Sequence, residues 1–313
     1  MKLRTIKTTV YAREFQMGSM RVKQPLPSRH AEQVSPFILL HHAGPTPVEA
    51  GRPSARISPH PHRGFEPVTF VFSGKIHHRD SLGNEGFLQA GDVQWMTAGR
   101  GVIHSEGPSE QFAAEGGIME IVQLWINLPR KDKMTAPRYQ DIPSSLIPQM
   151  EMAGGKWKLK VVAGEFMLEK GPAKTFSPIQ AVMIEFEAGA TVQLPVPQNF
   201  NTMIYVLDGK LEVNEQPVAH RNMVEFANDG DAIQLTSVEK GKMLFLAGEP
   251  INEPLVSYGP FVMNTKEEIN QAFEDYHKTQ FGGWPWPKYD QVHDRTKTRF
   301  AKHADGKVEI KTA

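Results

Sequence analysis

The chain contains one pattern twice, and this repeat constrains its fold more than any other feature. When Gly74 is aligned with Gly209, the first copy reads ISPHPHRGFEPVTFVFSG and the second reads VQLPVPQNFNTMIYVLDG. Phe65 then matches Phe200, and the segment GDVQWMT that begins at Gly91 resembles a later GDAIQLT. The copies lie farther apart than the repeats of a solenoid, so we expect two copies of a whole β-domain.

Short apolar runs rich in β-branched and aromatic residues indicate that these domains are sandwiches or barrels. Examples are PVTFVFSG, GIMEIVQLWINL and MIYVLDGKLEV, and the 26 glycines and 24 prolines of the chain are scattered between such runs. We expect one domain over residues 1–130, a proline-containing linker over 131–155 and a second domain over 156–313. That second domain would include a helix over 265–281, which a TKEE capping box introduces, and a polar tail.

Composition excludes several functional classes. Lys plus Arg and Asp plus Glu both number 35, so no basic excess points to direct nucleic-acid binding. The chain has no cysteine, which excludes disulfides, thiolate metal sites and thiol nucleophiles. The N-terminus lacks the apolar run of a signal peptide, and no stretch approaches the ~20 apolar residues of a membrane span. We therefore expect a cytoplasmic protein without a membrane partner.

Two pairs of metal-ligand residues have the spacing that a β-strand needs. His60 and His62 flank Pro61, and residues two apart on a strand point to the same side. His104 and Glu106 repeat this spacing after a glycine-rich turn. Strands of one small barrel can bring both pairs to one point. Three neutral imidazoles and a carboxylate would hold a divalent transition metal and, if the ion is octahedral, leave about two positions open.

The second copy of the repeat lacks these ligands. It has Pro195 and Pro197 where the first has His60 and His62, so we expect one metal-binding domain and one metal-free domain. Glu66 follows His62 by four residues, and three readings of it stay open: a ligand, a partner of a histidine, or a charge at a strand end.

The remaining paired histidines are weaker candidates. His41-His42 and His77-His78 are adjacent in sequence, so their side chains would diverge on a strand. We expect them in a polar loop or at the rim of a pocket.

Several long motifs together resemble the pirin family of bicupins. They are HPHRGFEPVTFVFSG, GDVQWMTAGRGVIHSE, QLWINLP and GPFVMNTKEEI, and they occur in the order of that family. The resemblance implies an all-β fold of two cupin barrels in tandem with a C-terminal helix, and iron in the N-terminal barrel only. It places the ligands on His60, His62, His104 and Glu106, and it places Glu66 beside them rather than among them. The loop HHAGPTPVEAG after Leu40 departs from the residues usual in the family, which leaves the substrate open.

The resemblance also implies an activity, that of a quercetin 2,3-dioxygenase. Such an enzyme opens the central ring of a flavonol with O2 and releases carbon monoxide. Fe(II) is the expected metal, although cobalt, nickel, copper or manganese would suit the same ligands. Glu106 could accept the proton of the flavonol hydroxyl. The residues expected around this small aromatic substrate are Arg63, Phe65, Glu66, Trp95, Met96, Gln123 and Trp125.

Two other functions stay open. The first is an iron-containing, redox-sensing regulator that binds a protein partner without turnover, since a change of oxidation state alters the charge by one unit. The second is a barrel that a metal only stabilises and that binds an unrelated small ligand. Release of carbon monoxide would distinguish the dioxygenase from both.

Overall fold

The computed structural model describes residues 1–18, 20–51, 56–287 and 300–310. The chain forms two compact units, each assembled from three segments. The unit that we call the N-terminal barrel comprises Gln16–Val22, His42–Ser144 and Asn252–Ala313. The unit that we call the C-terminal barrel comprises Met1–Phe15, Lys23–His41 and Ser145–Ile251.

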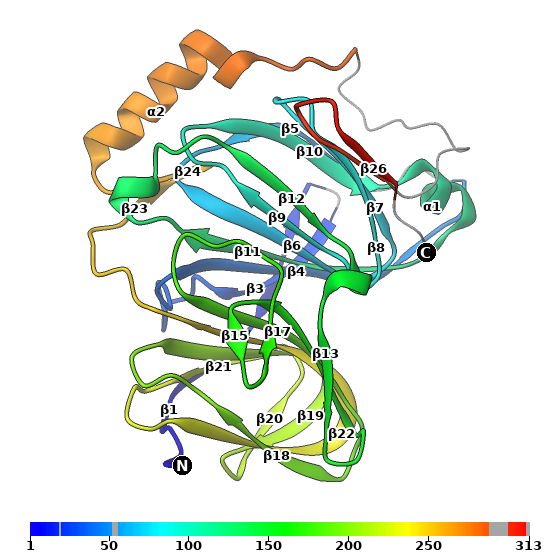
Figure 1. Cartoon of the computed structure of the whole chain (residues 1–313), viewed down its shortest axis with the longest axis vertical. Coiled ribbons are helices and arrows are strands. Elements are labelled where there is room, and N and C mark those ends of the chain that lie inside the picture. The colour runs from blue at the N-terminus through cyan, green and yellow to red at the C-terminus, as the bar shows by residue number, and fades with distance from the viewer. Residues whose placement is uncertain (19, 52–55, 288–299, 311–313) are drawn as a thin grey trace. The chain divides into compact units, whose positions relative to one another are not determined.

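The N-terminal barrel is built around two sheets (Figure 1). The strands of the first, in spatial order, are β12 (Arg138–Ile142), β9 (Val93–Thr97), β6 (Phe65–Ser73), β11 (Gly117–Asn127), β4 (Phe37–Val48), β3 (Met20–Leu26) and β2 (Arg13–Met17). Each of the last three strands has some of its residues in the C-terminal barrel. Those of the second are β26 (Val308–Ile310), β25 (Phe300–Lys302), β8 (Glu85–Gln89), β7 (Lys75–Asp80), β10 (Val102–Pro108) and β5 (Ile57–His62). Val71 of the first sheet packs against Ile76 and Leu88 of the second, which closes an apolar interior between them.

The C-terminal barrel is a single sheet that folds onto itself. In spatial order its strands are β1 (Ile6–Tyr11), β21 (Asn222–Phe226), β19 (Asn201–Val213), β22 (Ala232–Gly248), β17 (Ile179–Phe186), β14 (Trp157–Ala163) and β13 (Gln149–Met152), with β18 (Ala190–Pro195) paired to β22 and β20 (Gln216–Ala219) paired to β19. The first half of β22 pairs with β18 and its second half with β17. This double use of a long strand encloses a core that includes Trp157, Phe186 and Phe245.

Short elements connect these strands. They are the helices α1 (Glu110–Glu115) and α2 (Lys266–Thr279), the 3-10 turns η1 (Arg130–Asp132), η2 (Ser144–Leu146) and η3 (Gln280–Gly282), and the strand pairs β15 (Glu165–Phe166) with β16 (Glu169–Lys170) and β23 (Val256–Tyr258) with β24 (Phe261–Met263). The predicted capping box is present, because Thr265 and Glu268 exchange side-chain to backbone hydrogen bonds at the start of α2. The buried face of α2 packs Ile269 and Ala272 against Phe261. No helix in the described part of the chain has the length and apolarity that a membrane crossing requires.

The units differ from the domain bounds expected from the sequence at both ends of the chain. β1 pairs with β21, so the first residues join the C-terminal barrel. The last residues return to the N-terminal barrel, where β25 pairs with β8. Trp286 also contacts the N-terminal barrel. Its Nε1 donates a 2.8 Å hydrogen bond to the Asp80 carbonyl, and its ring centroid lies 4.5 Å from the Arg79 guanidinium.

Candidate metal centre

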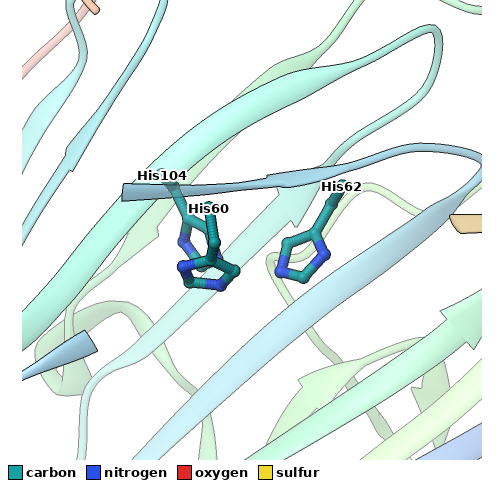
Figure 2. A group of neighbouring side chains, drawn as sticks. All are labelled: His60, His62 and His104. Carbon is teal, nitrogen blue, oxygen red and sulfur yellow. The ribbon is translucent and has the colours of Figure 1, made fainter. Parts of the chain in front are cut away.

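Strand register brings three histidines together in the N-terminal barrel. β5 and β10 are antiparallel, and His60 lies directly opposite His104 while His62 lies opposite Val102. Opposed residues project on the same face of a sheet, and so do residues two apart on one strand. Ring centroids are 4.4 Å apart for His60 and His104, 4.7 Å for His60 and His62, and 4.9 Å for His62 and His104. Figure 2 shows the three rings gathered at one point, where one nitrogen of each lies within 4.8 Å of the others.

The hydrogen bonds of these rings leave nitrogens suited to a metal. His60 Nδ1 donates to the Ser58 carbonyl at 2.9 Å, and His62 Nδ1 donates to the Pro260 carbonyl at 3.4 Å. In both rings this leaves Nε2 as the acceptor nitrogen. Among the described residues, Nε2 of His62 and both ring nitrogens of His104 have no hydrogen-bond partner although they are buried. Buried polar atoms normally have partners, so these atoms fit a bound cation.

The protonation of the three rings also suits a metal. Burial lowers the pKa of His60, although its bond to the Ser58 carbonyl partly offsets this. Burial holds the pKa of His62 well below its usual range, and the neighbouring His60 lowers it further. The pKa of His104 is likewise far below its usual range, first because of burial and then because of the surrounding imidazoles. Neutral imidazole is the form that coordinates a cation, so the site needs no deprotonation to bind one.

Glu106 lies on the same strand as His104 but in a second group. Its carboxylate and one nitrogen each of His78 and His104 lie within 4.8 Å of one another. Gln123 donates to Glu106 Oε1 at 2.7 Å and Thr69 donates to Oε2 at 3.4 Å. Burial raises the pKa of Glu106 to about 7, although these two hydrogen bonds act in the opposite direction. A cation beside it would favour the carboxylate.

His78 is the member of this second group that the sequence reasoning missed. It was expected in a polar loop or at a pocket rim, but it is 0% exposed and lies opposite Glu106 in the pairing of β7 with β10. Its neighbour His77 is bonded to Glu85 at 2.9 Å. Adjacent histidines diverge as expected, so only one of the pair meets Glu106. Only the register between β7 and β10 identifies which one, and no sequence signal gives that register.

Glu66 lies in neither group. It is buried, accepts a 2.7 Å hydrogen bond from the Thr97 hydroxyl and lies 3.5 Å from the Arg138 guanidinium. Burial raises its pKa to about 7, which the hydrogen bond from Thr97 and the charge of Arg138 only partly offset.

Two of the expected pocket aromatics border the histidines. Phe65 and Trp125 stack with centroids 4.2 Å apart, and their rings lie 5.0 and 5.1 Å from that of His62. The Trp125 indole donates to Gln123, which in turn holds Glu106. These contacts orient ligand-type side chains from the facing sheet.

Three other residues expected in the pocket make contacts away from the histidines. Trp95 is completely buried, and Met96 belongs to an apolar cluster with Tyr139. Arg63 donates to the Arg100 carbonyl and to Asp275 of α2, both at 2.8 Å. The guanidinium of Arg63 therefore holds α2 on this barrel.

A cavity of about 760 Å³ opens on the Glu106 side of the histidines. Of the residues expected to contact substrate or metal, Glu106 is the one that lines it. Apolar side chains form much of the remaining wall, and they include Val48, Ile57, Ile76, Pro108, Met119 and Ile121. Glu106 thus lies between the histidine cluster and a space large enough for a small organic molecule.

Comparison with known proteins agrees with this architecture. The family model described as Pirin matches residues 19–126, and the model described as Pirin C-terminal cupin domain matches residues 181–282. A Pseudomonas aeruginosa protein named "Putative quercetin 2,3-dioxygenase" is 40% identical over 250 residues, which cover 80% of this chain and 87% of that protein. Pirin-like protein 2 of Arabidopsis thaliana is 38% identical over 277 residues, covering 86% of this chain and 82% of that protein.

A solved structure gives the same result. The crystal structure of a quercetin 2,3-dioxygenase from Acinetobacter baumannii superimposes with a TM-score of 0.86 at 38% identity and covers 90% of this chain and 99% of that one. The resemblance inferred from the sequence motifs and the fold of two cupin barrels with a C-terminal helix are therefore confirmed. The chain belongs to the pirin family.

Proposed function

We propose that this protein is a metal-dependent dioxygenase that opens the central ring of a flavonol such as quercetin with O2. The observation that carries the proposal is the convergence of His60, His62 and His104 beside Glu106, which faces an apolar cavity. The names of two similar proteins point to the same reaction. A divalent ion held by these side chains, which we propose to be Fe(II), would supply Lewis acidity towards flavonol oxygens and reactivity towards O2.

In this proposal the histidines bind and Glu106 moves a proton. The three imidazoles are neutral, so with the Glu106 carboxylate they leave a divalent ion a net charge of about +1, which favours an anionic substrate. A cation bound beside Glu106 would favour its carboxylate form, which can accept a proton at neutral pH. Among the described residues, Thr69 alone donates to its Oε2, at 3.4 Å, so this oxygen is the better acceptor for the flavonol 3-hydroxyl proton.

The cavity supplies a binding surface for the substrate. A flavonol is flat and largely apolar, and a wall that includes Ile57, Met119 and Ile121 can cover its rings. Gln123 donates to Glu106 Oε1 and so fixes the carboxylate between the ring cluster and the substrate space.

The test is anaerobic purification with elemental analysis, followed by quercetin turnover and an assay for carbon monoxide. We expect about one iron per chain and carbon monoxide formed in proportion to the quercetin consumed. His220→Ala is a matched control, because this histidine is exposed and lies in the C-terminal barrel. Retained iron without carbon monoxide would refute the dioxygenase, and a partner bound only by ferric protein would then favour the redox sensor.

A further inference from the structure

The C-terminal barrel contains a cavity of about 510 Å³ that the proposed reaction does not use. One wall is formed by residues 9–15, where β1 leads into β2, and the other by residues 24–30, at the end of β3 and in the loop after it. Both walls belong to this one unit. The volume is within the range of pockets that bind small molecules.

The wall from β1 to β2 presents alternate residues to the cavity. Tyr11, Arg13 and Phe15 line it and are exposed, whereas Ala12 is buried. A strand period of two produces this alternation. An aromatic ring, a guanidinium and a second aromatic ring therefore follow one another along one face.

The opposite wall is held in place by hydrogen bonds. His41 Nε2 donates to Gln24 Oε1, and Gln24 Nε2 donates to the Pro27 carbonyl, both at 2.8 Å. Burial lowers the pKa of His41 to about 4, so this ring is a neutral part of the wall. Ser28 Oγ accepts two backbone N–H hydrogen bonds from within the loop. A wall that is fixed in this way needs little further ordering when a ligand binds.

The charges at this cavity are positive and lack acidic partners. The Arg13 guanidinium has no hydrogen bond or ion pair with another described residue. Arg29 Nε donates to His30 Nε2 at 2.9 Å, and its terminal nitrogens have no partner in the described part of the chain. No Asp or Glu is among the described residues that line the cavity, and the nearby Glu14 pairs with Arg221 at 3.8 Å. A chain with zero formal net charge thus has a local positive excess here.

We infer that this cavity binds a small aromatic anion, which is a flat ring that carries a carboxylate or phosphate group. Guanidinium groups bind the oxygens of both anions in pairs. The Ser28 oxygen already accepts two hydrogen bonds, so its hydroxyl hydrogen can donate to the anion. Tyr11 is 57% exposed and offers its ring for stacking. The inference concerns the C-terminal barrel and does not depend on the proposed function.

Titration calorimetry of the full-length protein tests this inference. Phenyl phosphate and benzoate are the probes, one for each kind of oxyanion. Benzamide is the uncharged control, and inorganic phosphate is the control without a ring. At least one probe should bind with a Kd below about 1 mM and about tenfold more tightly than both controls. If neither probe does so, the inference is overturned.

Variants then locate the bound anion. Arg13→Gln and Arg29→Gln each remove a charged donor, so the affinity for the better probe should fall about tenfold or more. Both arginines are exposed, so these variants should fold. Tyr11→Ala should remove the advantage of that probe over inorganic phosphate.

The matched control is Lys170→Gln, which removes an exposed positive charge from the same barrel outside the cavity. The affinity of this variant should equal that of wild type. Equal affinity in both arginine variants and this control would mean that the anion binds elsewhere, for example at a metal, and would overturn the inference. A Tyr11→Ala variant that still prefers the aromatic probe would overturn it as well.

Discussion

His60 lies opposite His104 across β5 and β10, but two residues further on the register shifts and Glu106 lies opposite Ile57. The irregularity between His104 and Glu106 inserts an extra residue on β5, which bends the strand locally. Glu106 is thereby placed towards His78 and the cavity, while His104 stays with the other two histidines. One strand thus supplies a ligand to the ring cluster and a carboxylate to the substrate side.

The first prediction concerns this shared histidine. His104→Ala should lower metal affinity by more than about 100-fold, because His104 belongs to both groups of donors. The metal-free variant should still fold, since the removed ring has no hydrogen bond among the described residues, and stability should change by less than about 2 kcal/mol. Metal titration and thermal unfolding measure both quantities. Equal metal affinity in His104→Ala and the His220→Ala control would refute the assignment.

The second prediction separates the two roles of Glu106. Glu106→Gln keeps an oxygen that can contact a cation but loses the negative charge and the base. Turnover should fall by about 10²- to 10⁴-fold, while metal occupancy should fall much less. The exposed Glu115→Gln is a control from the same barrel. Parallel loss of turnover and metal would count against a base role.

Local patterns were sufficient to predict two similar β-domains and the gathering of three histidines at one point. The repeat around Gly74 and Gly209 indicated two similar β-domains, and the spacing of His60 with His62 indicated one ligand face. These features depend on a strand period of two, which is visible in sequence.

Features that depend on pairing between distant segments could not be predicted. His78 meets Glu106 only because of the register of β7 on β10, and β25 returns to β8 from the far end of the chain. Arg63 directly follows His62 in sequence, yet it bonds to Asp275 of α2. A strand pattern gives the face of each side chain but not the partner on the next strand.

The third prediction concerns pH and Glu66. Burial raises its pKa in the folded state to about 7 from 4.5, so between these values the folded protein binds more protons than the unfolded one. Stability should therefore fall as pH rises from about 4.5 to 7. Glu66→Gln removes this titration. The free energy of unfolding of the variant relative to that of wild type should therefore increase by up to about 3 kcal/mol from pH 5 to pH 8. Urea unfolding at both pH values measures the gain, and the same difference at both would contradict the prediction.

The fourth prediction assigns Arg63 to α2 rather than to the substrate. Its side chain is 5% exposed, and it bonds to Asp275 and to the Arg100 carbonyl while its guanidinium lies 4.7 Å from the Phe281 ring centroid. Lysine cannot reproduce this planar set of contacts. Arg63→Lys should lower the free energy of unfolding by about 1 to 3 kcal/mol and increase hydrogen exchange in α2. KM for quercetin should stay unchanged. A raised KM with normal exchange in α2 would instead place Arg63 at the substrate.

The last prediction tests whether the 760 Å³ cavity binds the substrate. Ile57 lines it and lies opposite Glu106, so Ile57→Phe adds bulk next to the carboxylate without removing a donor. KM for quercetin should rise at least about tenfold, as expected when a hydrophobic pocket loses room, and metal content should stay at the wild-type level. Leu168→Phe is the control, because this residue is 98% exposed and belongs to the C-terminal barrel. Met119→Trp adds bulk to the same wall and serves as a second variant. If neither variant changes KM, the flavonol binds elsewhere and Glu106 is not the proton acceptor.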